Sequence, residues 1–187
     1  IMAKLLNNSI DKIITIDPHL HRYKSLKDIF TISTKKITAN SVIANYVKKK
    51  FKKPIIIGPD WESYQWAEVI AKSVGCESTV LEKTRFSSRK ISSKMIKHID
   101  CKHKEVIIID DIISTGHTIA EAAKKARKQG AKSITAIGVH GLFVEGAIKK
   151  MQKSGVTQVL TTNCIEHKTN KIDVTPLLLE ELKKEKR

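Results

Sequence analysis

Short runs of β-branched apolar residues alternate along the chain with segments whose apolar residues recur every three or four positions. The runs predict strands, and those at residues 55–57 and 106–109 contain no polar residue, which is typical of strands buried on both faces. The periodic segments predict helices; at residues 41–51, for example, Ile43 and Val47 are four positions apart. Because strands and helices alternate, we expect an α/β fold with a doubly wound, largely parallel sheet.

The individual elements follow from this pattern. Strands are expected at residues 12–17, 55–57, 78–81, 106–109, 133–139 and 158–160. Helices are expected at residues 41–51, 62–73, 117 or 118 to 129, and 145–153, with a last one from residue 176. A polar loop should span residues 82–90, and a short helix should follow it to about residue 99. The run at 106–109 should lie near the centre of the sheet.

The chain is strongly basic. Its 187 residues include 35 Lys and Arg against 19 Asp and Glu, a formal net charge of +16, which would suit nucleic acid, an anionic surface or a phosphorylated substrate. The basic residues are almost all lysines near expected helix ends, and aromatic residues, at 5%, offer few platforms for base stacking. We therefore favour solvated helix faces, expect no nucleic-acid partner, and rank a nucleic-acid-binding module last among the functions considered.

Hydropathy and cysteine usage restrict the class of protein further. No apolar run approaches the roughly 20 residues that cross a bilayer, so we expect no membrane partner. The three cysteines, Cys76, Cys101 and Cys164, lie far apart and form no Cys-x-x-Cys pair. Their odd number argues against a disulfide framework or a zinc ribbon and favours a reduced, cytoplasmic protein.

Two adjacent carboxylates, Asp110 and Asp111, follow the expected strand at residues 106–109. In an open parallel sheet, ligands bind beyond the carboxyl ends of the strands. Carboxylates accept hydrogen bonds and repel phosphate, so this pair suits neighbouring hydroxyls such as the 2- and 3-hydroxyls of a ribose. A purely structural role, in which the two acids cap the turn, is the less favoured interpretation.

The turn that follows these acids suits a phosphate group. It carries three hydroxyl side chains, Ser114, Thr115 and Thr118, around Gly116, and it opens a helix. Backbone N–H groups of such a turn, together with the positive end of the helix dipole, can hold a phosphate. Carboxylates and turn together predict a site for a phosphorylated sugar.

This stretch resembles the phosphoribosyl-pyrophosphate signature loop of the type I phosphoribosyltransferase fold. Other segments narrow the resemblance to the family of ribose-phosphate pyrophosphokinases, or phosphoribosyl pyrophosphate synthases. These segments are residues 12–19, which end in Asp-x-His; residues 55–60, which end in Pro-Asp; Lys83-Thr84-Arg85, which is similar to the Lys-x-Arg of a catalytic loop; Gly138-Val139-His140-Gly141; and the tail from 162–165 to 174–178. They match in order and spacing over nearly all of the chain.

The resemblance implies an enzyme, a ribose-phosphate diphosphokinase. Such a transferase moves the diphosphate of ATP to the 1-hydroxyl of ribose 5-phosphate and gives phosphoribosyl pyrophosphate and AMP. It further implies ATP and ribose 5-phosphate as binding partners, Mg²⁺ as the cofactor, a cytoplasmic location and a homo-oligomer. Two alternatives stay open: a phosphoribosyltransferase that consumes phosphoribosyl pyrophosphate, and a catalytically silent regulatory paralogue of the synthase.

The family's site residues carry over to the matching positions. Lys83 and Arg85 would be catalytic, and Asp60 would lie on the diphosphate side. His19, with Asp17, would contact the magnesium that bridges the ATP phosphates, since strand alternation would put both on one face. Ribose 5-phosphate would be held by Asp110, Asp111, Ser114, Thr115, Gly116, His117 and Thr118.

The resemblance also implies a domain organisation. Residues 1–40 would be a remnant of an N-terminal phosphoribosyltransferase-like domain, and residues 41–187 would form the C-terminal one. The first residue is Ile1 rather than a start methionine, so we expect the chain to begin within a domain. Much of the family's purine pocket would then lie outside these residues. We expect them to bind ribose 5-phosphate but, alone, to convert ATP to AMP negligibly.

Four departures from the family pattern stand out. Trp61-Glu62-Ser63 replaces glycines that let the backbone approach phosphate. Ser114 stands where an acid is common, and His117 where glycine or a small residue is common. Lys35 stands near the position of an acidic residue on the metal side. Trp61-Glu62-Ser63 and Lys35 bear on the diphosphate and metal side of the site, whereas Ser114 and His117 bear on the signature loop.

Overall fold

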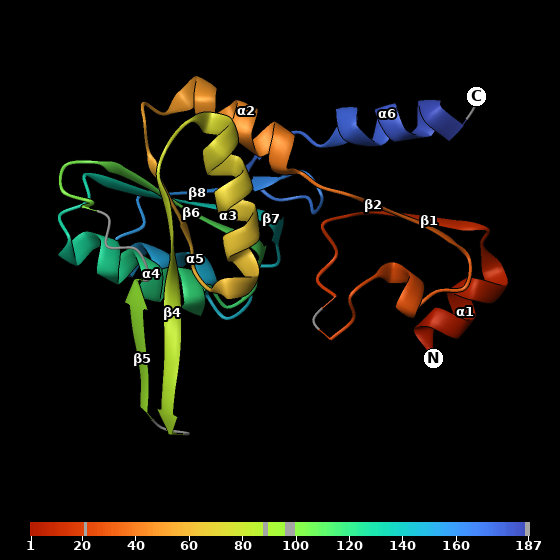
Figure 1. Ribbon diagram of the computed structural model, residues 1–187, viewed down its shortest axis with the longest axis horizontal. Helices are drawn as coiled ribbons and strands as arrows, with labels where there is room; N and C mark the ends of the chain where they lie inside the picture. The colour runs from red at the N-terminus through yellow and green to blue at the C-terminus, as the bar shows by residue number, and fades with distance from the viewer. Residues whose placement is uncertain (21, 88–89, 96–99, 186–187) are drawn as a thin grey trace. The chain divides into compact units, whose positions relative to one another are not determined.

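The computed structural model describes the backbone of residues 1–20, 22–87, 90–95 and 100–185, and the side chains of these residues outside 81–95 and residue 185 (Figure 1). The chain divides into two compact units. The larger is Asn40–Asp173, and the smaller combines Ile1–Ala39 with Val174–Arg187. The expected assignment of residues 1–40 and 41–187 to two related domains stays a prediction. Among the described residues, no helix is long and apolar enough to span a bilayer.

The larger unit is built on a seven-stranded sheet with the order β5-β4-β3-β6-β7-β8-β9. Its strands are β3 (Ile55–Gly58), β4 (Ser78–Ser87), β5 (Lys90–Met95), β6 (Glu105–Ile113), β7 (Ser133–Gly141), β8 (Gln158–Thr162) and β9 (Asn170–Ile172). All neighbours are parallel except β4 and β5, which are antiparallel. The expected α/β fold is confirmed, and the apolar run of β6 occupies the central strand, also as predicted.

Helices cover both faces of this sheet (Figure 1). They are α2 (Asn40–Lys50), α3 (Trp61–Val74), α4 (His117–Lys128) and α5 (Ala147–Lys153). α2 contacts α3, and α4 contacts α5. Ile55 and Ile57 of β3 share a core with Ala122 and Met151 from the second pair of helices. Ile56, between them in the strand, points to the opposite face, because successive residues of a strand alternate between faces. It is also fully buried, so both faces of β3 are covered.

The segment after β4 differs from the expectation. The polar loop predicted at residues 82–90 is wrong, since β4 continues to Ser87, and the short helix predicted to residue 99 is wrong at residues 90–95, which form β5. Leu81 pairs with Met95 and Lys83 with Ser93 in an antiparallel hairpin. A hairpin pairs backbone N–H and C=O groups whatever the polarity of the side chains. Polarity therefore misled the prediction.

The smaller unit contains a two-stranded parallel sheet. Its elements are α1 (Met2–Ser9), β1 (Lys12–Ile16), the 3₁₀ helix η1 (Leu26–Asp28), β2 (Ser33–Ile37) and α6 (Thr175–Glu185). The Lys35 ammonium of β2 lies 3.0 Å from a Glu181 carboxylate oxygen of α6, and this contact lowers the pKa of Glu181. Lys35, the departure from the family's metal side, thus joins two elements of this unit.

Candidate active site

The two acids of β6 occupy different environments. Both lie within the strand, because β6 continues to Ile113. Asp111 is buried, and its Oδ1 accepts a hydrogen bond from the Ile112 amide at 2.8 Å. Asp110 is half-buried, and its Oδ1 accepts from the Asp111 amide at 3.1 Å. Asp110 lines a pocket at this end of the strand, whereas Asp111 is not among the residues that line it.

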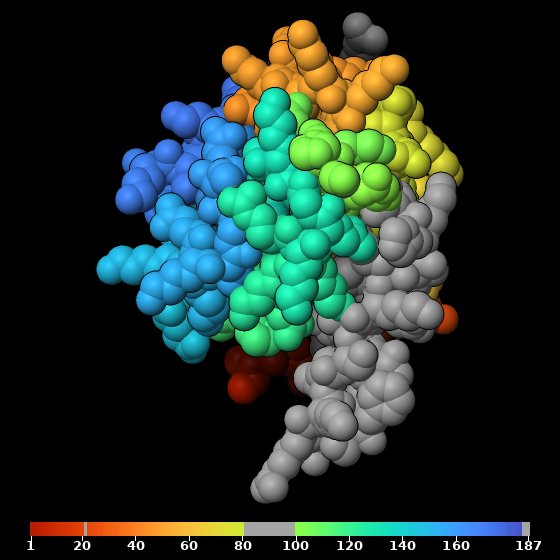
Figure 2. All heavy atoms as spheres, turned by 90° about the vertical axis from the view of Figure 1, so that its left-hand side faces the viewer, coloured from red at the N-terminus to blue at the C-terminus, as the bar shows by residue number. Residues whose placement is uncertain are grey.

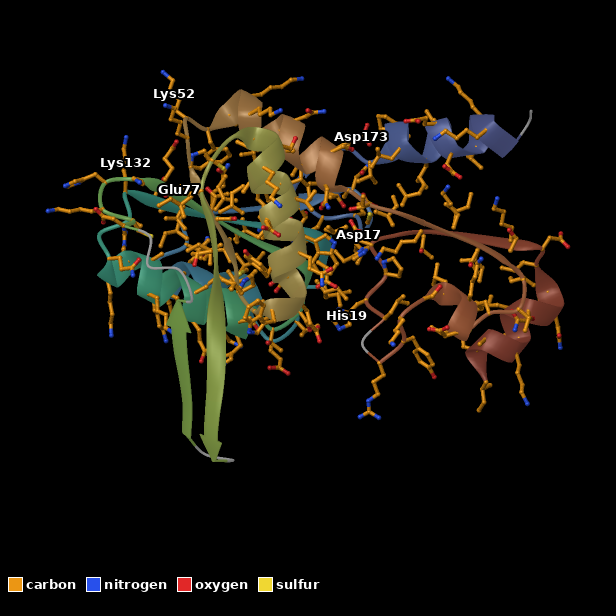
Figure 3. The ribbon with its side chains drawn as sticks, viewed as in Figure 1. Asp17, His19, Lys52, Glu77, Lys132 and Asp173 are labelled. Carbon is orange, nitrogen blue, oxygen red and sulfur yellow. The ribbon has the colours of Figure 1, made fainter. Side chains whose placement is uncertain are left out.

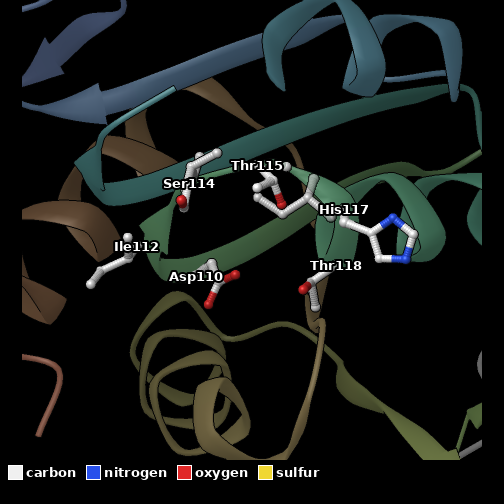
Figure 4. Close-up of a pocket in the computed structure, with 9 residues that line it drawn as sticks. Asp110, Ile112, Ser114, Thr115, His117 and Thr118 are labelled. Atoms are coloured by element: carbon white, nitrogen blue, oxygen red, sulfur yellow. The ribbon is translucent and has the colours of Figure 1, made fainter. Parts of the chain in front are cut away.

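This pocket encloses about 80 Å³ and is lined by Asp110 and by residues 112–119. Its volume is far below the roughly 300–1,000 Å³ of pockets that hold drug-sized molecules, so it suits a small group such as a phosphate. In Figure 4 the Asp110 carboxylate and the Thr118 hydroxyl lie on the same side of the loop, while the His117 ring points away. Nε2 of His117 lies 3.2 Å from a carboxylate oxygen of Glu121, one turn along α4.

The start of α4 leaves backbone donors open to the pocket. Gly116 is the N-cap residue, and among the described residues no side chain caps this helix end. The first N–H groups of a helix have no partner within the helix and carry its positive dipole end. Together with the hydroxyls of Ser114, Thr115 and Thr118, they form an arrangement that can bind an anion.

Gly116 is fixed by both its conformation and its packing. Its φ of +67° lies in the left-handed region that favours glycine. A Cβ atom here would lie 3.0 Å from Cγ of Met151 and 3.2 Å from the carbonyl oxygen of Ala147, both in α5. The turn therefore sits directly against α5, and a side chain at Gly116 would push it away.

A loop that the sequence analysis did not assign to the site supports this turn. After β7, the amides of Leu142 and Phe143 donate to the Ile113 carbonyl at 3.0 and 3.1 Å, and the Val144 amide donates to the Ser114 carbonyl at 3.2 Å. These bonds anchor the pocket from the neighbouring strand. The signal in the sequence was the matching segment that ends in Gly141, which begins this loop.

Asp60 lies at the N-cap of α3, after β3. Its Oδ1 accepts from the Ser63 amide at 3.0 Å, and the Ser63 hydroxyl oxygen accepts from the Asp60 amide at 3.1 Å. This is a reciprocal capping box. Where the family has glycines near phosphate, this chain begins a capped helix. The amides of Asp60 and Ser63 are therefore already hydrogen-bonded to side chains.

The electrostatics of the pocket centre on Asp110. Burial raises the pKa of Asp110 well above its usual value, and repulsion from Asp60 and then Asp111 raises it further. A ligand in the pocket that brings a cation or hydrogen-bond donors would therefore stabilise the ionised form of Asp110. Sugar hydroxyls are such donors.

The expected metal ligands Asp17 and His19 belong to the smaller unit (Figure 3). β1 ends at Ile16, so strand alternation does not relate the two residues. Asp17 is buried and its Oδ2 accepts from the Ala39 amide at 2.7 Å, whereas His19 is exposed. The described residues contain no group of three or more His, Cys, Asp or Glu that would hold a metal alone. This donor set fits a Mg²⁺ carried mainly by phosphates and water, and does not fit an all-protein cage.

The expected catalytic residues Lys83 and Arg85 lie in β4. Their side chains fall outside the part of the chain that the structure describes. Their catalytic role stays a prediction.

Comparisons with known proteins agree with this fold. The family model for the phosphoribosyl transferase domain matches residues 25–177. A ribose-phosphate pyrophosphokinase of Methanobrevibacter smithii is 33% identical over 190 residues, covering 93% of this chain and 63% of that protein. One of Pyrococcus abyssi is 35% identical over 179 residues, covering 96% and 61%. A crystal structure of phosphoribosylpyrophosphate synthetase from Mycobacterium smegmatis matches with a TM-score of 0.81 and 25% identity, covering 97% and 61%.

The chain thus spans less than two thirds of the length of these relatives. The expected resemblance to ribose-phosphate pyrophosphokinases is confirmed. Because the family model extends over most of the chain, including both β6 and the turn that opens α4, the chain belongs to the phosphoribosyl transferase domain family.

Proposed function

We propose that this chain provides the ribose 5-phosphate site of a ribose-phosphate diphosphokinase. The observation that carries the proposal is one pocket in which Asp110 and the uncapped start of α4 meet. This pocket offers hydrogen-bond acceptors for a sugar and donors for a phosphate. Relatives named ribose-phosphate pyrophosphokinase support the same reaction.

The two halves of the pocket have separate roles in this proposal. The amides at the start of α4 and the hydroxyls of Ser114, Thr115 and Thr118 bind the 5-phosphate. The Asp110 carboxylate accepts hydrogen bonds from ribose hydroxyls, which compensate its buried charge. Asp111 supports the strand end from its buried position, through the Ile112 amide. His117, whose ring points away, contributes its backbone.

In the proposed reaction, the 1-hydroxyl oxygen of ribose 5-phosphate forms a bond to the β-phosphorus of ATP. The bond from that phosphorus to the oxygen shared with the α-phosphorus breaks, AMP departs, and the hydroxyl proton is released. Catalysis of such a transfer is mainly positioning and stabilisation of charge. We assign the stabilisation to Lys83 and Arg85, as the family resemblance implies.

Mg²⁺, held by the ATP phosphates with His19 and Asp17 as protein partners, would neutralise phosphate charge. Asp60 can lie on the diphosphate side only if a cation separates its carboxylate from the phosphates, because two anions repel. The capping box around Asp60 and Ser63 leaves their amides engaged. Diphosphate binding in this chain thus depends on cations more than on the amides of Asp60 and Ser63.

Three further properties belong to the proposal. The native protein is a homo-oligomer, and ATP is its second substrate. A cytoplasmic location is supported by the three described cysteines, all of which are free thiols.

The experiment that tests the function follows AMP release by the native protein. AMP should form only when ATP, ribose 5-phosphate and Mg²⁺ are all present. Consumption of phosphoribosyl pyrophosphate with a nucleobase, and no AMP from ATP, would instead identify a phosphoribosyltransferase. Binding of ribose 5-phosphate without either reaction would identify a silent paralogue.

A further inference from the structure

The far end of α4 carries a second hollow, lined only by basic and uncharged residues. It encloses about 670 Å³ between the C-terminal ends of α4 and α5. The basic residues are Lys124, Arg127, Lys128 and Lys153, and none of the described residues that line it is acidic. We call this hollow the α4–α5 groove. Figure 2 shows this face, with α4 in green to teal beside α5 in blue.

The groove is separate from the candidate active site. That site lies at the N-terminal end of α4, whereas the groove lies at its C-terminal end. α4 has 12 residues and is therefore about 18 Å long. A ligand in the groove would not contact the pocket around Gly116.

The positive charges of the groove are not neutralised by the described carboxylates. No described acid forms an ion pair with any of its four basic side chains. Glu121, on the same helix, pairs with His117, and its negative charge interacts with the Lys125 ammonium. By contrast, Lys104, elsewhere in the larger unit, does form an ion pair: its Nζ lies 3.3 Å from a carboxylate oxygen of Glu77. The charge of the groove is thus available to an external anion.

Arg127, which lines the groove, is held between α4 and the turn that follows α5. Its Nη1 donates to the carbonyl oxygen of Ala131 at 3.2 Å. Gly155, after α5, has a φ of +103°, and a Cβ there would lie 3.5 Å from Nε of Arg127. The arginine therefore spans α4 and the turn after α5. A guanidinium held in this way loses little freedom on binding, and it has further N–H donors for phosphate oxygens.

We propose that the α4–α5 groove binds an oligophosphate chain, such as the diphosphate or triphosphate part of a nucleotide or free inorganic oligophosphate. Four cations around one hollow suit a ligand with several negative charges. The volume lies within the roughly 300–1,000 Å³ of small-molecule sites. No aromatic side chain is among the described residues that line the groove, so the phosphates, rather than a base, are recognised. This inference does not depend on the proposed function.

The test is an NMR titration of the chain with tripolyphosphate, which follows backbone amides of both sites. We expect saturable shifts at residues 124–128 and 152–156, separate from any shifts at 114–118. In the triple variant Lys124→Gln, Lys128→Gln, Lys153→Gln, the affinity should fall about tenfold or more, as expected when three exposed charge pairs are lost. Arg127→Lys, which keeps the charge but not the planar fork, should weaken binding less.

A matched control separates the groove from general positive charge. The triple variant Lys36→Gln, Lys48→Gln, Lys50→Gln removes the same charge from exposed positions elsewhere and should leave the affinity unchanged. The affinities for ATP and for tripolyphosphate, compared directly, distinguish the two sources, and AMP, with a single phosphate, should not bind the groove. Equal loss in both triple variants, shifts confined to 114–118, or tighter binding of a DNA oligonucleotide across all lysine clusters would overturn the proposal.

Discussion

The carboxylate of Asp60, at the N-cap of α3, raises the pKa of the Asp110 carboxyl in the adjacent strand. Asp60 follows β3, Asp110 lies within β6, and these two strands are parallel neighbours. Their repulsion is therefore a consequence of the sheet order. The sheet order thus brings a second carboxylate close to Asp110, which lines the same pocket as the start of α4.

Substitution of Asp60 tests this relationship. In Asp60→Asn, the pKa of Asp110 should move down toward its usual value, because the second-largest cause of the shift is removed. Asparagine caps helices about as well as aspartate, so α3 should persist. NMR titration of the Asp110 carboxyl carbon measures the change. Glu62→Gln, an exposed charge change beside it, is the control; an equal shift in both variants would contradict the assignment.

The same shift predicts how stability depends on pH. The folded-state pKa of Asp110 lies above its value in the unfolded chain, so between the two values the folded protein binds more protons. The contribution of Asp110 to the free energy of unfolding should therefore fall as pH rises through this window. Asp110→Asn should remove that decline and, at neutral pH, raise the free energy of unfolding.

The same variant, Asp110→Asn, should lose ligand affinity while it gains stability. Hydrogen bonds to a charged group are worth about 1.5–3 kcal/mol, so ribose 5-phosphate should bind roughly tenfold to a hundredfold more weakly. Calorimetry and thermal unfolding on one preparation measure both effects. Asp111→Asn keeps an acceptor for the Ile112 amide and should change affinity less. Unchanged affinity in Asp110→Asn would remove Asp110 from the sugar site.

Gly116→Ala should distort the pocket. The substitution meets both a left-handed φ and a Cβ contact with Met151 at 3.0 Å, so we expect a loss of about 1–3 kcal/mol in stability and weaker phosphate binding. Gly146→Ala is the matched control, since Gly146 also caps a helix with a φ of +70° but has no atom within 4 Å of its Cβ position among the described residues. Equal effects of the two variants would show that packing against α5 is unimportant.

Much of this arrangement was predictable from the sequence. β3 and β6 are apolar throughout, so their burial and the central place of β6 followed from pattern alone. The turn at 114–116 followed from its hydroxyls and glycine. The hairpin of β4 and β5 did not, because backbone pairing leaves no apolar pattern. The contact of Gly116 with α5 joins segments about 30 residues apart, a relationship that local patterns do not encode.

The metal side shows the same limit. Asp17 and His19 are two positions apart, which predicted a shared face of a strand. The strand ends at Ile16 and Asp17 turns inward, with a φ of +37° and a bond to the Ala39 amide. A strand end set by tertiary hydrogen bonds cannot be located from spacing alone.

Lys83→Ala in the native protein tests the catalytic assignment. If Lys83 stabilises charge that develops in the transition state, kcat should fall about 10²–10³-fold with little change in substrate affinity. Steady-state AMP release and calorimetry separate the two effects. Lys48→Ala, an exposed lysine of α2, is the control. If Lys83→Ala is as active as the parent protein, the assignment of Lys83 as a catalytic residue is wrong.

The central claim is that the pocket at the start of α4 binds ribose 5-phosphate. The most direct measurement is an NMR titration of this chain with ribose 5-phosphate, with ribose and inorganic phosphate as separate arms. We expect saturable shifts at the amides of residues 114–118, strongest with ribose 5-phosphate, weaker with phosphate and weakest with ribose. Shifts of equal size with phosphate and ribose 5-phosphate, or none at residues 114–118, would contradict the account.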